Sequence, residues 1–442
     1  MPADAASEIS EDEPLEESPS EAGDSEFPRM EWWDTVHWER ILHLAAKTTA
    51  MIPSSMKHAV AEFKGRICRS IEEAASQRRR AEEERCWKLL LASDGLLFAE
   101  NSESTQGSRR TAIAEKLAWI EGGQWDAVCS MADDRGKGSG DMRDPMEAAV
   151  KLIEDLMKEG ELSRAAATVW AATAADTATQ VADKFAQTQA RPVPDGPPLP
   201  QPQPGQAEAL KRRVQAQIKK SFARFARRGG AGPGGGRYEH WEALAGDPDL
   251  ADAVAGTLAR LAVGHLPPDA MRACLAARLA GIPKASGGLR VLGCGGVIRR
   301  MVARAAAKAC KAELRAAGGP QQYGLSDDGT GKLHRKPTAL TAVRPGVVVM
   351  ALDIADAFST VDRRAVVEAV ASGVPVLLPL AEQWLQGEVF HVAGAAGDEV
   401  DGAMGRIMDG KADKATGRIM NGAADEGDEA GECDEYLHVV VM

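Results

Sequence analysis

The sequence feature that most constrains the fold is an apolar run, Val347 to Leu352, that ends directly in Asp353. An unbroken apolar run of strand length predicts a buried strand. A carboxylate at the end of such a strand is partly desolvated, which costs free energy unless a cation or hydrogen bonds compensate. The sequence therefore predicts a rigid element that can present Asp353 to a metal ion.

Two more carboxylates follow this strand, Asp356 and Asp362. Ser359 and Asp362 have the spacing of a capping box and predict a helix that begins near Ser359. Helix capping is the simpler interpretation of Asp356 and Asp362, but it does not account for Asp353.

Residues 282–292 predict a β-hairpin, because two short strand-like segments flank a Ser-Gly-Gly turn. Lys284 and Arg290 lie on its two arms, where both are available to the same phosphate. Two exposed bases on a surface hairpin are the alternative interpretation.

Residues 297–317 predict one helix that stops at Gly318. Its bases recur every three or four residues and therefore form a cationic stripe along one face. Such a stripe can follow a nucleic-acid backbone, or it can simply be a solvated face. The stripe comprises Arg300, Arg304, Lys308, Lys311 and Arg315.

Acidic residues concentrate near the two ends of the chain. Residues 1–27 and 398–435 carry −10 and −8 of the formal net charge of −12, so residues 28–397 carry +6. Within this basic part, residues 211–228 hold eight bases and no acid, with Phe222 and Phe225 among them. This segment predicts a basic amphipathic helix that binds phosphates, serves as a nuclear import signal or forms a solvated face.

Changes in composition divide the chain into six segments, of which the acidic ends have too little apolar surface to fold. In the second segment, the charged run 77–84 is expected inside one helix, 67–91, where i,i+4 pairs join Arg78 to Glu82 and Arg79 to Glu83. The predicted segments are a disordered acidic tail (1–30), a helical region (31–191), a Pro-rich linker (192–206), a basic helix with a Gly-rich linker (207–236), a folded segment with the motifs above (237–397) and a low-complexity acidic tail (398–442).

Cysteine usage and missing motifs exclude several classes of protein. Seven scattered cysteines without a Cys-x-x-Cys pair predict reduced thiols and an intracellular protein. No stretch approaches the roughly 18 apolar residues that a membrane span requires, so no membrane partner is expected. The P-loop and dinucleotide glycine patterns are incomplete, and the His residues are too isolated to form a catalytic triad.

Four motifs within residues 282–371 together resemble the fingers and the first palm motif of non-LTR retrotransposon reverse transcriptases. The resemblance implies an α+β fold, in which a mainly helical N-terminal region precedes an incomplete right-hand polymerase fingers and palm in residues 237–397. The motifs are Ile282-Pro283-Lys284 with Gly287-Gly288-Leu289-Arg290, Val297 to Ala303, Gln322-Tyr323-Gly324 with His334, and Leu352 to Arg363.

The resemblance also implies a role for each matching residue. Asp353 is expected to be catalytic and to bind Mg²⁺, with help from the backbone carbonyl of Ile354. Lys284 and Arg290 are expected to hold the incoming triphosphate, and Phe358 to stack under the sugar and exclude a 2′-hydroxyl. The implied partner is an RNA template or a DNA primer.

Besides the carboxylate of the first motif, the family's palm needs a carboxylate pair further along the chain, written aromatic-x-Asp-Asp. No such motif follows Phe358. Two metal ions need clustered carboxylates for phosphoryl transfer. We therefore expect a truncated RNA-directed DNA polymerase that is inactive alone, unless another retroelement chain supplies the missing palm. The alternatives are a non-catalytic RNA- or DNA-binding module in residues 211–315 and a non-functional remnant.

Overall fold

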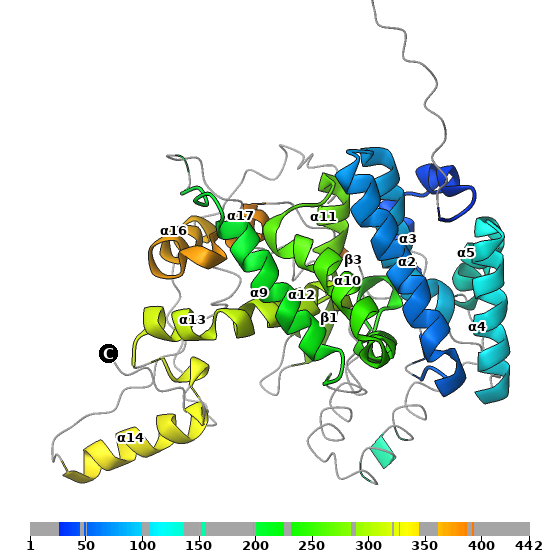
Figure 1. Cartoon of the computed structure of the whole chain (residues 1–442). Helices are drawn as coiled ribbons and strands as arrows, with labels where there is room; N and C mark the ends of the chain where they lie inside the picture. Colours follow the sequence, from blue (N-terminus) through cyan, green and yellow to red (C-terminus); the bar gives the residue numbers. More distant parts are fainter. Residues whose placement is uncertain are drawn as a thin grey trace, which may run out of the picture.

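The chain forms a mainly helical body with one small sheet in the computed structural model (Figure 1). The helical part of the predicted fold class is thereby confirmed. The structure describes residues 26–44, 48–49, 51–99, 106–136, 200–224, 231–283, 289–320, 322–326, 328–343, 361–386 and 391–392, together with positions 150, 153, 154, 157 and 198.

The N-terminal part is a group of helices around α3, in which α2 and α3 pack side by side (Figure 1). Helix α3 is buried on nearly all sides from Cys86 to Phe98, so it forms the centre of this part. Here the described elements are η1 Met30–Thr35, α1 Trp38–His43, η2 Ser54–Met56, α2 Lys57–Ser76, α3 Arg80–Phe98, α4 Gln106–Glu121 and α5 Trp125–Gly136.

The single helix predicted over 67–91 is wrong, because the chain turns between α2 and α3. Arg78 has a left-handed φ of 58°, which ends α2 and reverses the chain. Arg79 now pairs with Glu82 and, at 3.3 Å, with Glu73, in place of the expected i,i+4 pairs. The turn lets the apolar faces of both helices pack together, and local charge spacing cannot show this.

Residues 26–30 are part of the folded body, although composition placed them in a disordered tail that ends at residue 30. Phe27 and Met30 are each only 1% exposed and belong to the core. The Phe27 ring packs edge-on against Phe63 at 5.9 Å, and the Arg66 guanidinium lies 4.7 Å from its centroid. The buried side chains of Phe27 and Met30 thus anchor residues 26–30 to the helices.

The second part begins with α9, an amphipathic helix with Leu210, Val214, Ile218 and Phe222 buried. Its described elements are α9 Gln206–Ser221, η3 Pro233–Gly235, η4 Tyr238–Gly246, α10 Pro248–Ala259, η5 Arg260–Val263, α11 Pro268–Cys274, β1 Ala277–Pro283, β2 Leu289–Gly295, α12 Val297–Ala309, α13 Lys311–Gly318, η6 Tyr323–Leu325, α14 Gly329–Val343, α16 Arg363–Gly373, η7 Pro375–Leu377, α17 Leu378–Gln386 and β3 His391–Val392.

The sheet has the strand order β2-β1-β3. Strands β1 and β2 are antiparallel, with a register that runs from Ala277 opposite Gly295 to Pro283 opposite Leu289. The predicted hairpin is therefore confirmed, although its turn lies outside the described residues. Strand β3 adds two residues parallel to β1.

The Gly-rich segment 231–236, predicted from composition to be part of a linker, packs against the core. Residues 232–236 are buried. Thr48 Oγ1 donates to the Gly235 carbonyl oxygen at 2.6 Å, and Arg237 Nε donates to the same hydroxyl at 3.2 Å. A side chain at Gly232 would meet the backbone of Gly295 at 2.7 Å, so glycine permits this close approach.

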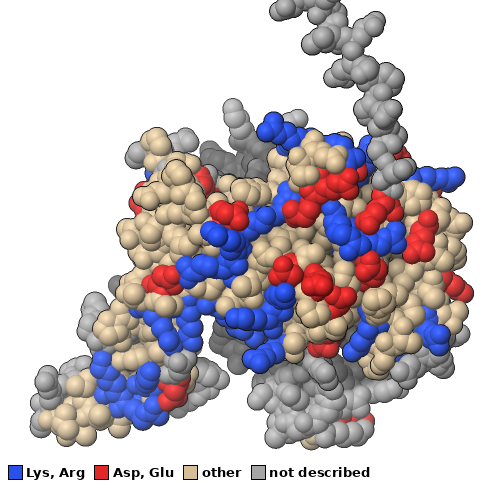
Figure 2. Space-filling view, in the orientation of Figure 1, with Lys and Arg blue, Asp and Glu red and all other residues tan. Residues whose placement is uncertain are grey.

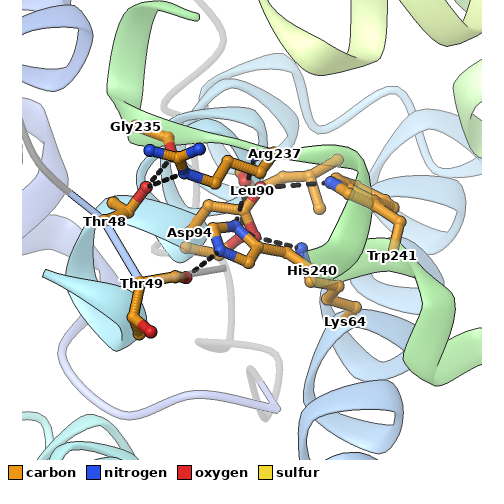
Figure 3. A network of polar contacts seen from close by, with 10 residues as sticks. Thr48, Thr49, Lys64, Leu90, Asp94, Gly235, Arg237, His240 and Trp241 are labelled. Carbon is orange, nitrogen blue, oxygen red and sulfur yellow. Dashed lines mark hydrogen bonds and ion pairs between the residues drawn. The ribbon is translucent and has the colours of Figure 1, made fainter. Parts of the chain in front are cut away.

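A buried polar network joins the two parts of the chain (Figure 3). Lys64 of α2 donates to Asp94 of α3 at 2.6 Å, and Trp241 of η4 donates to the other carboxylate oxygen at 3.1 Å. His240 Nδ1 lies 3.5 Å from Asp94, and its Nε2 lies 2.8 Å from the Thr49 carbonyl oxygen. One hydrophobic core surrounds this network and includes residues from both parts.

Candidate nucleic-acid interface

Most of the predicted polymerase site lies outside the described residues. This holds for Lys284, Asp353, Ile354 and Phe358. For Arg290 the structure describes the backbone, which pairs with Ile282 across the hairpin. The catalytic and triphosphate-binding roles of these residues stay predictions.

Asp362 is a helix cap, as the simpler interpretation of this carboxylate predicted. Its side chain accepts hydrogen bonds from the backbone N–H groups of Arg364 at 2.8 Å and Ala365 at 3.2 Å. Helix α16 therefore begins at Arg363, and the predicted start near Ser359 is wrong. Both hydrogen bonds of Asp362 serve the helix terminus, where unpaired N–H groups need acceptors.

The cationic stripe predicted on one helix lies on two. The helix breaks at Cys310, where φ is −111° and ψ is 18°, so α12 carries three of the five bases and α13 carries two. The Arg300 guanidinium lies 4.9 Å from the Tyr238 ring centroid, and Arg315 donates to the Leu325 carbonyl oxygen. These two bases contribute to packing within the chain.

The other three stripe residues, Arg304, Lys308 and Lys311, are exposed. On α12, Arg304 and Lys308 lie away from the buried face of the helix. That face is formed by Met301, Val302, Ala305 and Ala306. The period of the helix thus places the cations at the surface, as the sequence predicted.

Helix α9 packs against α12 and adds a second row of cations. Arg212 and Lys220 are exposed on the side of α9 opposite the buried apolar residues, and Arg224 is exposed just after the end of the helix. Phe222 is 1% exposed and faces the core, so it cannot stack on a nucleic-acid base, and Phe225 lies outside the described residues. The basic composition of 211–228 was the sequence signal for this row.

Two other bases of α9 hold the helix in place. Arg213 pairs with Glu313 of α13 at 2.7 Å and donates to the carbonyl oxygen of Ala309. Lys219 pairs with Asp252 of α10 at 3.1 Å. The Glu313 backbone amide and then the Arg213 side chain hold the pKa of Glu313 below its usual value, so this carboxylate is ionised at neutral pH.

Figure 2 shows Lys and Arg side chains gathered over α9 and continuing over α13 towards α14. We define the basic surface as six exposed cations of α9, α12 and α13 and of the residues that directly follow α9. Within the described part of the chain, no carboxylate forms an ion pair with any of its α9 or α12 members. The basic surface comprises Arg212, Lys220, Arg224, Arg304, Lys308 and Lys311.

Exposed cations spread over adjoining helices suit the phosphates of a nucleic-acid strand. The described residues include no group of His, Cys, Asp or Glu side chains that could hold a metal ion. The predicted Mg²⁺ site falls on Asp353 and Ile354, beyond these residues, and stays a prediction.

Comparison with known proteins gives no family assignment. The chain matches no protein-family model and no curated protein sequence. Among the described residues, no helix combines the length and apolar character that a membrane crossing requires.

Proposed function

We propose that this protein binds single-stranded RNA through its basic surface, as a reverse-transcriptase-like chain of a retroelement. The observation that carries the binding proposal is the set of exposed cations on α9 and α12 without a carboxylate partner among the described residues. The order of the β1–β2 hairpin and the basic helix α12 along the chain supports the resemblance to polymerase fingers.

Fluorescence anisotropy with a labelled single-stranded RNA tests the binding. Affinity should fall as salt rises, because binding of cationic side chains to phosphates releases counterions. The double variant Arg304→Glu and Lys308→Glu should weaken binding at low salt and reduce the salt slope by about 0.7 for each phosphate that the variant no longer neutralises.

A matched control carries Lys57→Glu and Arg110→Glu, which reverse two exposed charges on α2 and α4, away from the basic surface. This control changes the net charge by the same amount and should bind nearly as the wild type does. Equal weakening by both double variants would contradict a localised interface. The same titrations with single-stranded DNA measure the preference between the two nucleic acids.

The polymerase part of the proposal predicts little or no synthesis by this chain alone, because no aromatic-x-Asp-Asp motif follows Phe358. Primer extension on an RNA template with Mg²⁺ and deoxynucleotides checks this. Extension that disappears in the Asp353→Asn variant would overturn the expected inactivity and would identify Asp353 as catalytic.

A further inference from the structure

A second cationic feature is a pocket of about 460 Å³ at the turn between α2 and α3. Its other wall is the segment that joins η5 to α11. The lining residues are Ala75, Arg78, Arg80, Glu83, Arg260, His265, Leu266, Pro267 and Pro268.

Charge in this pocket is predominantly positive. Its one carboxylate, Glu83, accepts a hydrogen bond from Arg260 Nη2 at 2.5 Å, and Glu72 lies 3.7 Å from Arg260 Nη1, so the charge of Arg260 is already compensated. Arg78 and Arg80 are exposed at the rim, and within the described residues neither forms an ion pair. Two guanidinium groups therefore remain available to an anion.

His265 lies on the pocket lining, within electrostatic range of Lys211 and Arg260. Burial lowers its pKa, and repulsion from Lys211 and Arg260 lowers it further, while Glu208 acts in the opposite direction. The cations near the ring thus outweigh the nearby acid. An anion in the pocket would favour the protonated imidazole and raise this pKa.

The backbone at Arg78 is unusual for its residue type. Its φ of 58° lies in the left-handed region, which glycine or asparagine usually fills at a helix C-terminus. The turn is held by backbone hydrogen bonds from Arg78 N–H to the Ala75 carbonyl at 3.1 Å and from Arg79 N–H to the Ala74 carbonyl at 2.8 Å. A residue that is unfavourable for this backbone thus places a guanidinium at the pocket rim.

We propose that the pocket is a binding site for a phosphate-bearing anion, held by Arg78 and Arg80, with His265 on another part of the lining. The planar guanidinium fork matches two phosphate oxygens, and two such groups favour a dianionic or diphosphate ligand. The pocket volume suits a pyrophosphate or a strand terminus rather than a duplex. The lining of this pocket shares no residue with the basic surface, so the proposal does not depend on the function of that surface.

Titration calorimetry of the full chain with pyrophosphate tests the site. In the variant Arg78→Gly the cation is removed, but glycine adopts the left-handed backbone readily, so the fold should be kept and the melting temperature should not fall. Removal of one charge-assisted hydrogen bond should weaken binding about tenfold or more, and Arg80→Gln should do likewise.

The control variant Arg212→Gln removes an exposed cation of the basic surface and should bind pyrophosphate as the wild type does. Pyrophosphate should also raise the pKa of His265, measured by NMR with His265→Asn to assign the signal. Wild-type binding by both pocket variants, or an unchanged His265 pKa at saturation, would overturn the proposal.

Two RNA oligonucleotides distinguish the possible sources of the phosphate. One carries a 5′-phosphate end and the other a 5′-hydroxyl end. If the 5′-phosphate strand alone competes with pyrophosphate, the site takes strand termini. If neither strand competes, the site takes small phosphate compounds. Equal competition by both strands that persists in Arg78→Gly would place pyrophosphate on the basic surface and would contradict the proposal.

Discussion

At the scale of single residues, the most consequential contact is the ion pair between Lys64 and Asp94. Burial lowers the pKa of Lys64, and Asp94 opposes this effect. Burial tends to raise the pKa of Asp94, but Lys64 and His240 together hold it well below its ordinary value. The Lys64 ammonium also lies 3.7 Å from the Trp241 ring centroid, a favourable cation–π geometry. Each charge is thus tolerated only because the other is present.

Removing one member of this pair should be costly. Asp94→Asn leaves the Lys64 charge buried without its counterion and should lower the free energy of unfolding by about 3–5 kcal/mol. The double variant Lys64→Met with Asp94→Asn should recover part of that loss. Urea denaturation measures all three, and Asp252→Asn, which breaks the exposed pair with Lys219, should cost less than about 1 kcal/mol. A small loss in Asp94→Asn would show that the pair contributes little.

Acid should weaken the fold through the same carboxylate. The folded pKa of Asp94 lies below its unfolded value of about 3.9, so the unfolded chain takes up a proton first as the pH falls. The stabilisation is therefore complete at neutral pH and is lost below about pH 4. Chemical denaturation across this range should show a steeper loss in the wild type than in Asp94→Asn. Parallel curves would assign the acid sensitivity to other carboxylates.

At the scale of elements, the sequence predicted those features that depend on a single local segment. The basic run 211–228 predicted an amphipathic helix, and α9 has this character, with Leu210, Val214 and Ile218 buried. The hairpin of β1 and β2 also followed from local turn chemistry. The turn at Arg78 and the burial of 231–236 did not follow, because both depend on packing between segments distant in sequence.

In the candidate interface, too, local features were predicted and contacts between distant segments were not. Helical spacing predicted a stripe of five bases along α12 and α13, of which Arg304, Lys308 and Lys311 are exposed. It could not predict that Arg300 lies over the Tyr238 ring, since that ring comes from η4. The break at Cys310 was also missed, because the composition of 297–317 favours a helix throughout.

The Gly-rich element provides a test of close packing. In Gly232→Ala the new methyl group would lie 2.7 Å from the Gly295 carbonyl oxygen and the Gly296 Cα, so backbone must shift. The expected loss in free energy of unfolding is about 1–3 kcal/mol. Gly246→Ala is the matched control, because its methyl group would meet nothing within 4 Å and should be neutral or slightly stabilising. Equal stabilities for the two variants would mean that segment 231–236 yields easily.

At the scale of the whole molecule, the regions on either side of the predicted Pro-rich linker share one core. Helix α2 packs against α10, and α3 packs against η3 and α11. The spacing is close, because a side chain at Gly65 of α2 would meet the Leu250 side chain of α10 at 2.6 Å. Composition marks the Pro-rich stretch clearly, but it carries no information on whether the flanking helices bury their apolar faces against each other.

The shared core predicts that the two regions fold together. Residues 26–191 alone would expose the faces of α2 and α3 that α10, η3 and η4 cover, and would leave Lys64 and Asp94 without the Trp241 ring and His240. Such a fragment should therefore lack a cooperative thermal transition, and so should residues 200–392, while the full chain should show one. Circular dichroism melts of the three chains measure this, and mixing the fragments should restore a common transition. A fragment 26–191 that melts cooperatively at the temperature of the full chain would mean that the buried network joins two independently stable units.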